Sequence, residues 1–236
     1  MLKSLRITTE CNRIMSAIID ELQNFENSLM GPLLKIKVMA SRLGNAKVLE
    51  WVNNEINGYE HDKVPEYRNG TARTICNLHQ GYHVEECVPL PAMVIGLEWA
   101  NAINTYKFTD GVASLEALSK MGIEKEFGRS YGSDFDAYIT REMHRNGQRL
   151  VATHIQTICS ASEATKVLAT IRNKLLDLML ELEREDPDFE RKATGTTQEK
   201  QEVNQHLTAA MHVTITGSNN IINTGSGNDI LSGFIS

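Results

Sequence analysis

The chain has 236 residues, enough for one domain of about 200 residues with an appendage, so a core can be buried without disulfides. Hydrophobic residues make up 41% of the chain and charged residues 23%, as in ordinary globular proteins, and the net charge of -6 gives no overall attraction to nucleic acid or anionic membrane. No apolar run approaches the ~18 residues of a membrane span, and no signal peptide opens the chain. We therefore expect a cytoplasmic protein that contacts membrane only if activated.

The N-terminal segment is predicted to be helical. Apolar residues at spacings of three and four indicate a first helix that ends near Asn27. The stretch "GPLLKIKVMASRLGN" predicts a second helix, with a proline in its first turn and Gly44 at its exit. A third helix is expected to start after Asn45 and to close at Gly58.

Short strands and further helices are predicted in the middle of the chain. In "YRNGTARTICNLHQGYHVEECVPLP" the β-forming residues alternate around Gln80-Gly81, which favours a hairpin. Helical patterns return in "AMVIGLEWANAI" and "GVASLEALSKMG". Because "EKEFGRSYGSDFD" is polar and broken by glycine, we predict a loop there, and a mobile one is compatible with this composition.

The C-terminal part is predicted to contain a strand, a long helix and a β tail. The strand is "QRLVATHIQTIC", and a capping-box pattern of Ser160 and Glu163 precedes the long helix, which Pro187 ends. The segment "FERKATGTTQEK" has the composition of a linker. We therefore expect a domain over residues 1–190, a linker with a short helix over 191–211, and a Gly/Asn-rich β tail over 212–236. The fold class is α+β and mainly helical, with N-terminal helices, a small antiparallel sheet and a long C-terminal helix.

Signals for metal sites and catalytic residues are weak. Zinc would accept the two thiols and two imidazoles of Cys76, His79, His83 and Cys87, but strand alternation would point the first two to opposite faces. The same objection applies to Cys159 beside His154 as a nucleophile and its base, so structural residues are the better interpretation. In the tail, "TGSGNDILSG" is similar to a calcium-binding nonapeptide, but Asp229 is its only carboxylate. We predict no catalytic residue, metal or cofactor.

Basic side chains suggest a place for a ligand phosphate. Lys35, Lys37 and Arg42 lie on the predicted second helix, and Arg172 and Lys174 lie on the long one. Such groups donate charge-assisted hydrogen bonds to anions. The alternative is that they form the polar faces of amphipathic helices, and this is the weightier interpretation.

Three blocks of the chain, in order, resemble the AbiTii family of bacterial abortive-infection proteins. The first is "KIKVMASRLGNAKVLEWVNNEINGYEHDKVPEYR", the second is "VLATIRNKLLDLMLELEREDPD", and the third is the tail "VTITGSNNIINTGSGN". The resemblance implies a role in defence against phage and supplies no catalytic residues. Within the first block, the side chains to test first for ligand binding are Trp51, Asn54, Glu55, Tyr59, Tyr67 and Arg68.

Three functional hypotheses follow. The leading one is a non-enzymatic, oligomeric sensor or effector of antiphage defence, controlled by a nucleotide or oligonucleotide ligand and open to a partner protein encoded nearby. The second is a nuclease or nucleotide hydrolase whose residues converge only in three dimensions. The third is a membrane-disrupting oligomer whose apolar segment Ile230 to Ile235 becomes exposed on activation.

The tail itself predicts assembly. Set against itself at a period of eight, "ITGSNNII" aligns with "NTGSGNDI", which favours two short strands. These strands lack the charges and prolines that protect an exposed edge, and a lone hairpin is marginal in water. Copies from several subunits could pair and bury apolar side chains, so we predict a homo-oligomer, with a tetramer as the first choice, held by Val213, Ile215, Ile221 and Ile222.

Overall fold

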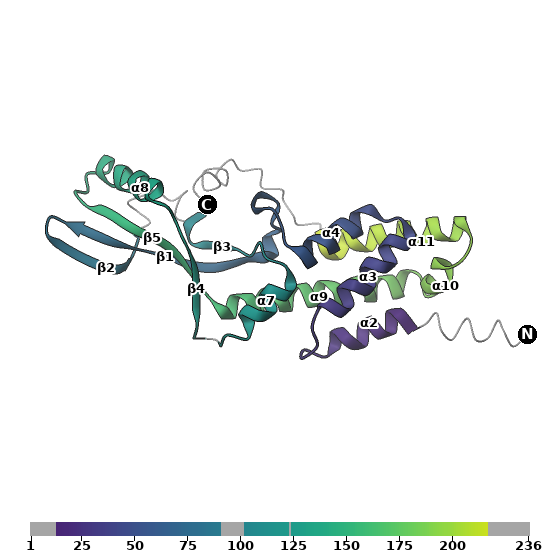
Figure 1. Ribbon diagram of the computed structural model, residues 1–236. Coiled ribbons are helices and arrows are strands. Elements are labelled where there is room, and N and C mark those ends of the chain that lie inside the picture. Colours follow the sequence, from purple (N-terminus) through teal and green to yellow (C-terminus); the bar gives the residue numbers. More distant parts are fainter. Residues whose placement is uncertain (1–12, 91–101, 123, 217–236) are drawn as a thin grey trace, which may run out of the picture. The chain divides into compact units, whose positions relative to one another are not determined.

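The computed structural model describes residues 13–90, 102–122 and 124–216 (Figure 1). Internal contacts divide the chain into two compact units. The helical unit contains the described residues 13–59, 110–116 and 168–216, and the sheet unit contains the described residues in 60–109 and 117–167. The described residues form the expected mainly helical α+β fold with a small antiparallel sheet.

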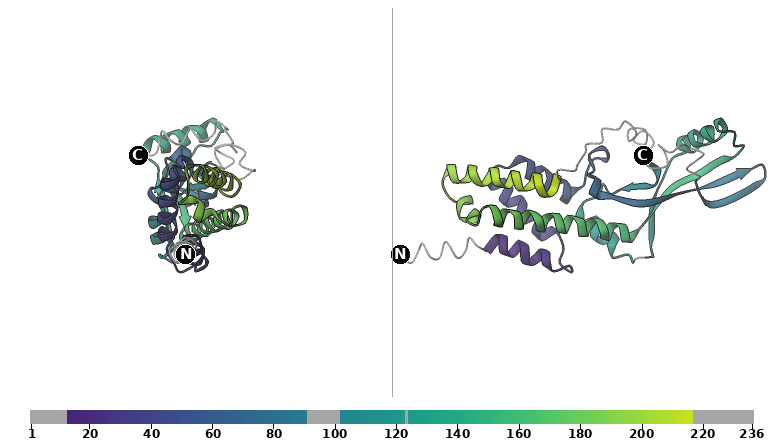
Figure 2. Two further views of the ribbon diagram at one scale, coloured as in Figure 1. Left: turned by 90° about the vertical axis from the view of Figure 1, so that its right-hand side faces the viewer. Right: turned by 180° about the vertical axis from the view of Figure 1, so that it is seen from behind.

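The helical unit is built from α2 (Arg13–Gln23), α3 (Met30–Leu43), α4 (Ala46–Asn57), the later part of α9 (Ala161–Glu185), α10 (Phe189–Ala193) and α11 (Thr197–Met211). Figure 2 shows α9 and α11 running alongside each other, with the short α10 in the connection between them. Apolar side chains at helical spacing form the core of this unit: Ile18, Leu22, Leu33, Ile36, Val48, Val52, Ile171, Leu175, Leu178, Val203 and Leu207.

Local capping fixes the boundaries of the early helices. Gly44 ends α3 with a left-handed φ of 68°, and the Asn45 side chain accepts a hydrogen bond from the Val48 N–H at 3.0 Å to begin α4. The Asn45 amide also donates to the Asn204 Oδ1 at 2.6 Å and to the Thr208 Oγ1 at 2.9 Å. The predicted second and third helices are therefore confirmed, and the α4 cap also binds α11.

The sheet unit contains an antiparallel sheet in the order β2-β1-β5-β4, with β3 paired to the start of β1. The strands are β1 (Asn69–Gln80), β2 (His83–Pro89), β3 (Thr105–Lys107), β4 (Glu126–Ser130) and β5 (Val151–Ser160). Their helices are α8 (Ser133–Arg145), the end of α7 (Val112–Ser119) and the start of α9, with the 3-10 turns η1 (His61–Lys63) and η2 (Glu66–Arg68). The predicted hairpin and the predicted strand before α9 are confirmed.

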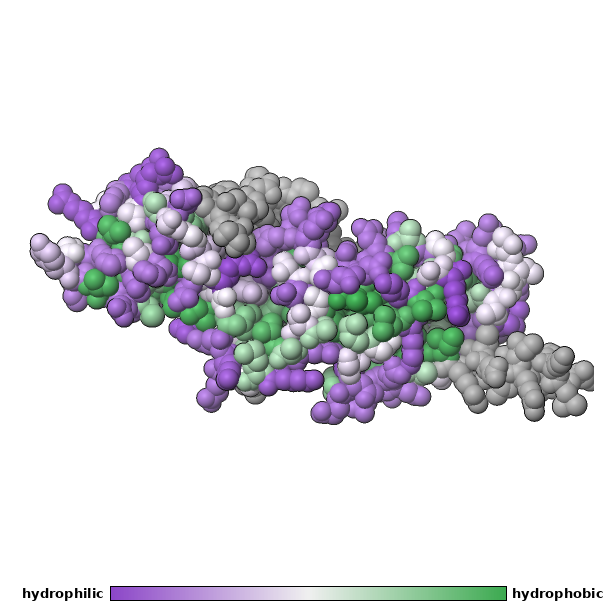
Figure 3. All heavy atoms as spheres, in the orientation of Figure 1, coloured by the Kyte–Doolittle hydropathy of each residue, from purple (hydrophilic) through white to green (hydrophobic). Residues whose placement is uncertain are grey.

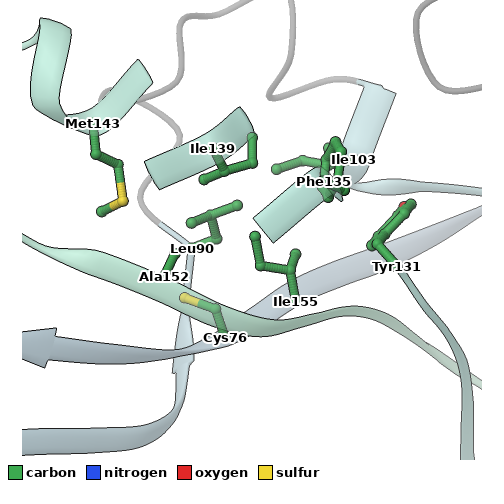
Figure 4. Packing of buried hydrophobic residues seen from close by; sticks show 9 residues of the cluster. All are labelled: Cys76, Leu90, Ile103, Tyr131, Phe135, Ile139, Met143, Ala152 and Ile155. Carbon is green, nitrogen blue, oxygen red and sulfur yellow. The ribbon is translucent and has the colours of Figure 1, made fainter. Parts of the chain in front are cut away.

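One face of the sheet packs against α8. Figure 4 shows Phe135, Ile139 and Met143 of α8 beside side chains of β1 and β5. The Tyr131 and Phe135 rings lie 4.5 Å apart between centroids. The whole cluster consists of Cys76, Leu90, Ile103, Tyr131, Phe135, Ile139, Met143, Ala152 and Ile155.

The prediction of a loop in "EKEFGRSYGSDFD" is wrong, because this segment forms β4 and the first turn of α8. β4 pairs with β5 from Glu126 opposite Ser160 to Ser130 opposite Gln156. A Cβ on Gly128 would lie 2.4 Å from the carbonyl oxygen of Thr157, so the glycine permits close strand pairing. Pairing across the chain therefore outweighs the polar composition of the segment.

The prediction of a linker in "FERKATGTTQEK" is also wrong, because this segment contains α10 and the start of α11. Phe189 is 1% exposed in α10, and Thr196 and Glu199 form a reciprocal capping box that begins α11. Hydrogen bonds from the Thr196 backbone and the Arg191 side chain lower the pKa of Glu199 to about 2. The expected short helix is thus the end of a 15-residue helix.

The described start of the tail differs from the expected strand. His212–Thr216 forms a π-helical turn after α11, with Ile215 buried and Val213 60% exposed. The Thr214 Oγ1 donates to the Ala210 carbonyl at 2.9 Å, a bond that continues the helical geometry. The rest of the tail, including Ile221, Ile222 and Asp229, lies outside the described residues, as do residues 1–12, where the predicted first helix begins, and most of "AMVIGLEWANAI".

Candidate anion-binding site

Basic side chains from three separate elements of the sheet unit gather at one place. His61 belongs to η1, Lys107 ends β3, and Arg129 lies in β4. The Lys107 Nζ donates to the His61 carbonyl oxygen at 3.4 Å. The Arg129 guanidinium lies 5.7 Å from the centroid of the Tyr106 ring, within the range of a cation–π contact. The charges of Lys107 and Arg129 both act on the His61 imidazole. We call His61, Lys107 and Arg129 the basic cluster, with Tyr106 under Arg129.

An aromatic base supports the basic cluster. The Tyr106 ring packs edge-on against Phe108 at 5.1 Å and against Phe127 at 5.3 Å. Phe108 is fully buried, whereas Tyr106 and Phe127 are half-buried. A Cβ on Gly70 would lie 2.7 Å from the Phe108 ring, so β1 needs a glycine where the rings cross it. The aromatic side chains therefore hold one another in place and leave Tyr106 partly accessible.

The electrostatics of the basic cluster favour an anion. Burial lowers the pKa of His61, and the positive charges of Lys107 and Arg129 lower it further, against the opposing effect of Asp62. Lys107 and Arg129 are therefore close enough to His61 for their charges to act on it. A bound anion would stabilise the protonated imidazole and the two permanent cations together.

Arg68 is a buried structural cation in the same unit. Its side chain is fully buried, and its Nη1 donates to the Phe108 carbonyl oxygen at 2.9 Å. The Phe108 N–H in turn donates to the Arg68 carbonyl oxygen at 3.0 Å. Arg68 thus fixes the backbone that follows β3. Tyr67, its neighbour in η2, is half-buried.

The other candidates from the family block lie in the helical unit, in or just after α4. Trp51 is 6% exposed and Glu55 is fully buried, so both are part of the packed interior. The Tyr59 hydroxyl donates to the Glu55 Oε1 at 2.7 Å, which brings these two candidates together. Asn54 is half-buried, and its carbonyl oxygen accepts from the Gly58 N–H at 2.8 Å at the end of α4.

The basic residues of the long helix have protein partners. Arg172 is 7% exposed, and its guanidinium donates to the carbonyl oxygens of Leu22 at 3.1 Å and Asn24 at 3.0 Å, at the C-terminal end of α2. The Lys174 Nζ donates to the Thr214 carbonyl at 3.0 Å and to the next carbonyl at 3.1 Å. Both side chains thus bind carbonyls at helix ends, where cations are favoured, and this accounts for them without a ligand.

Of the three basic residues of α3, two line a cavity and one does not. Lys35 and Arg42 line one small cavity in the helical unit, whereas Lys37 is absent from its lining. Lys35 also forms an ion pair with Glu21.

Sequence patterns for metal and thiol chemistry do not assemble into a site. Cys76 is buried and Cys87 is exposed, which separates the two thiols of the candidate zinc set. No group of three or more His, Cys, Asp or Glu side chains suited to a metal ion occurs within the described ranges. Burial raises the pKa of Cys159 to about 12, so its sulfur stays a thiol near neutral pH.

Sequence reasoning missed the basic cluster. Its members are separated along the chain, and one of them lies in β4, which the composition assigns to a loop. The available signal is the repeated placement of aromatic and basic residues, with Tyr106 before Lys107 and Phe127 two residues before Arg129. Strand alternation puts Phe127 and Arg129 on the same face.

The family comparison covers most of the described structure. The AbiTii family model matches residues 13–208. The chain belongs to the AbiTii family. Membership in AbiTii implies a role in abortive infection, the defence in which an infected cell stops supporting phage replication. Neither the curated proteins nor the solved structures provide a match.

Within the described part of this AbiTii chain, each helix is too short or too polar to cross a bilayer. The longest of them, α9, has 25 residues and carries charges along its length.

Proposed function

We propose that this AbiTii protein acts in phage defence as a non-enzymatic, oligomeric sensor or effector, and that a nucleotide or oligonucleotide bound at the basic cluster controls it. The observations that support the proposal are that Arg129 lies over the partly accessible Tyr106 ring, and that the charges of Lys107 and Arg129 both act on His61. The net charge of -6 means that attraction of an anionic ligand must come from such a local cluster.

The chemistry of the basic cluster fits both parts of a nucleotide. Arg129 and Lys107 can donate charge-assisted hydrogen bonds to phosphate oxygens, with Arg129 able to bind two of them at once. Tyr106 offers a ring on which a base can stack, a contact that tolerates any base. Phosphate with a neighbouring base is therefore a better match than phosphate alone.

Proton uptake should accompany binding. His61 has a pKa below its ordinary value of 6.5 in the ligand-free protein, and a bound phosphate raises it. The imidazole then gains a proton when the ligand binds. Affinity should consequently increase as the pH falls towards and below 6.5, until the ligand-free imidazole is itself protonated.

Fluorescence anisotropy of the full chain with fluorescein-labelled single-stranded dT10 tests the proposal. Two or three phosphate contacts predict about tenfold weaker binding between 50 and 200 mM salt, because each contact releases counterions. Competition by ADP and by inorganic phosphate separates base stacking from phosphate binding. Equal competition by the two would contradict a nucleotide ligand, and binding without salt dependence would contradict the site.

Matched variants locate the binding. Arg129→Ala should weaken binding of dT10 by roughly ten- to a hundredfold, since hydrogen bonds to charged groups are worth ~1.5–3 kcal/mol. Arg141→Ala is the control, because Arg141 also lies over a tyrosine ring, that of Tyr138 at 5.3 Å, on α8 of the same unit. If both variants bind equally, the basic cluster is not the site.

The oligomer is tested separately by light scattering. The full chain is compared with a chain ending at Thr216, which keeps α11 and the π-helical turn. A cut before α11 would remove the fully buried Val203 and Leu207 and unfold the helical core. We expect the full chain to form a tetramer and the shorter chain a smaller species, and equal stoichiometry would contradict the assembly role of the tail.

A further inference from the structure

The helix α3 presents an uncharged seam on the surface of the helical unit. Leu34 and Val38 are each 48% exposed, and Ile14 of the neighbouring α2 is 45% exposed. Figure 3 shows hydrophobic side chains gathered over the region of α3. Residues at spacings of three and four lie along one side of a helix. We therefore define the α3 seam as the exposed residues Gly31, Leu34, Val38 and Ser41.

A small cavity opens beside the α3 seam, among α2, α3 and α10. Its volume is about 80 Å³, and Val38 contributes to its lining. One water needs ~10–15 Å³ of such space, so the cavity accommodates a branched aliphatic side chain. Ligand pockets for whole nucleotides have volumes of about 300–1,000 Å³, so the cavity is too small for them. The apolar residues of the lining are Ile14, Val38, Met39, Leu43, Phe189 and Ala193.

The charges around the cavity leave one exposed cation at the end of α3. Lys35 lines the cavity but forms an ion pair with Glu21, so these two charges offset each other. Burial raises the pKa of Glu190, a further lining residue, and this favours its neutral form. Arg42 is exposed, and no ion pair among the described residues includes it. An apolar occupant with an acidic neighbour therefore fits the cavity and its rim.

The α3 seam is complementary to itself when two copies of the helix run antiparallel. Its spacing is symmetric about position 36, so reversal of the helix places Leu34 opposite Val38 of a second copy. The same reversal places Gly31 opposite Ser41, and these small residues let the two backbones approach at both ends. Because Leu34 is exposed and the cavity lies beside Val38, Leu34 of each copy then faces the cavity of the other.

The two ends of α3 carry opposite charges. Glu26 is exposed in the turn before α3, and Arg42 is exposed in the last turn of the helix. About 18 Å of helix separates Arg42 from Met30, so Arg42 is far from the Glu26 of its own chain. An antiparallel partner brings Arg42 over the start of the other α3, next to the turn that carries Glu26. A parallel partner would bring like charges together, so charge selects the antiparallel orientation.

We propose that two copies of this chain pair through their α3 seams in antiparallel orientation, with Leu34 of each copy in the cavity of the other and Arg42 beside the other copy's Glu26. This contact lies within the helical unit and goes beyond the proposed assembly through the tail. A tetramer of dihedral symmetry has more than one kind of two-fold contact. The α3 seam provides one such contact that does not involve the tail.

Light scattering of the full chain over a dilution series tests the pairing. Leu34→Glu puts a charge on the side chain that enters the cavity, and the loss of two buried leucines per pair predicts at least about a hundredfold weaker association. Where the wild type is fully assembled, this variant should have half the wild-type mass. Leu180→Glu is the matched control, because Leu180 is 46% exposed on α9, and it should keep the wild-type mass. Equal masses for the two variants, or a monomeric wild type, would overturn the proposal.

A charge exchange between copies tests the orientation. Arg42→Glu and Glu26→Arg each place like charges at both ends of the pair, so each variant alone should associate roughly tenfold more weakly. An equal mixture of the two variants should recover the wild-type mass, because both contacts of a mixed pair join opposite charges. Both side chains are exposed, so the variants should stay folded, which circular dichroism checks.

The mixture also distinguishes a second copy from other occupants of the cavity. If a segment of the same chain or a different protein filled it, mixing the two variants would restore nothing, and that result would overturn the proposal. The chain ending at Thr216 should keep the α3 pair, so a failure of assembly through the tail leaves this result unchanged. Binding of dT10 at the basic cluster is a further independent measurement.

Discussion

Substitution of Asp186 by asparagine should destabilise the helical unit substantially. Asp186 follows α9, and its side chain is 3% exposed. Its Oδ2 accepts hydrogen bonds from the Lys192 Nζ at 3.0 Å and from the His206 Nδ1 at 3.2 Å, and its Oδ1 accepts from the Asp188 N–H at 3.2 Å. One carboxylate thus connects the end of α9 to α10 and α11.

The expected loss of stability depends on how exposed the two charged partners, Lys192 and His206, are. Breaking a fully buried ion pair costs about 3–5 kcal/mol, and a hydrogen bond to a charged group contributes ~1.5–3 kcal/mol. The Lys192 side chain is 22% exposed and that of His206 is 40% exposed, so water compensates part of the loss. We expect Asp186→Asn to lower the free energy of unfolding by about 2–3 kcal/mol at pH 7, or the melting temperature by roughly 5–10 °C.

The pKa shift of Asp186 determines how the stability difference between wild type and variant changes with pH. Burial alone would raise the pKa of Asp186, but hydrogen bonds from Lys192 and His206, with the charge of Lys192, lower it below its ordinary value. The stabilisation is therefore complete above the unfolded-state pKa of about 3.9 and is lost as the pH falls through the lower folded-state pKa. The difference between wild type and variant should be constant from pH 5 to 8 and should shrink below pH 4.

Thermal and urea unfolding followed by circular dichroism measure the effect. Asp188→Asn is the matched control, because Asp188 lies two residues away, is 68% exposed, and has a long 3.7 Å ion pair with Arg191. This control should change the free energy of unfolding by less than about 0.5 kcal/mol. The reasoning is refuted if the two variants lose the same stability, or if the loss in Asp186→Asn is as large at pH 3 as at pH 7.

Three shorter predictions concern other parts of the fold. Burial raises the pKa of Cys76 to about 11 and that of Cys159 to about 12, so at pH 8 iodoacetamide should label Cys87 well before either of them, as peptide mass spectrometry would show. Gly128→Ala should destabilise the sheet unit by several kcal/mol, on the order of a severe core substitution, because the new Cβ would lie 2.4 Å from a β5 carbonyl oxygen. Arg172→Met should cost about 2–4 kcal/mol in urea unfolding by removing the hydrogen bonds from Arg172 to the carbonyls at the end of α2, and a neutral result would contradict the capping role.

Local signals made the N-terminal helices predictable. Gly44 and Asn45 define the junction of α3 and α4 within two residues, because a left-handed exit and a side-chain cap depend only on near neighbours. The hairpin around Gly81 is predictable for the same reason, since its positive φ of 62° needs only the turn itself. Boundaries fixed by residues within one turn of each other can be derived from sequence.

Structure that depends on distant partners could not be derived in this way. β4 exists because β5 pairs with it, and α10 exists because Phe189 fills the helical core. Neither segment has enough apolar residues of its own to show a period. The basic cluster depends on the same β4 pairing, because that pairing brings Arg129 from the predicted loop to the ring of Tyr106.

The position of a cation in the fold, rather than its presence in the sequence, separates a ligand site from a structural one. Arg172 and Lys174 lie on one helix, and both donate to backbone carbonyls at helix ends. Arg129 instead lies over a half-buried ring, beside a histidine whose pKa responds to its charge. The charges of Lys107 and Arg129 both act to lower the pKa of the His61 imidazole, and this positive potential favours an anion. If the proposed anion site exists, Arg129 should contribute more to binding than Arg141, and the matched variants compare a cation beside His61 with one on α8.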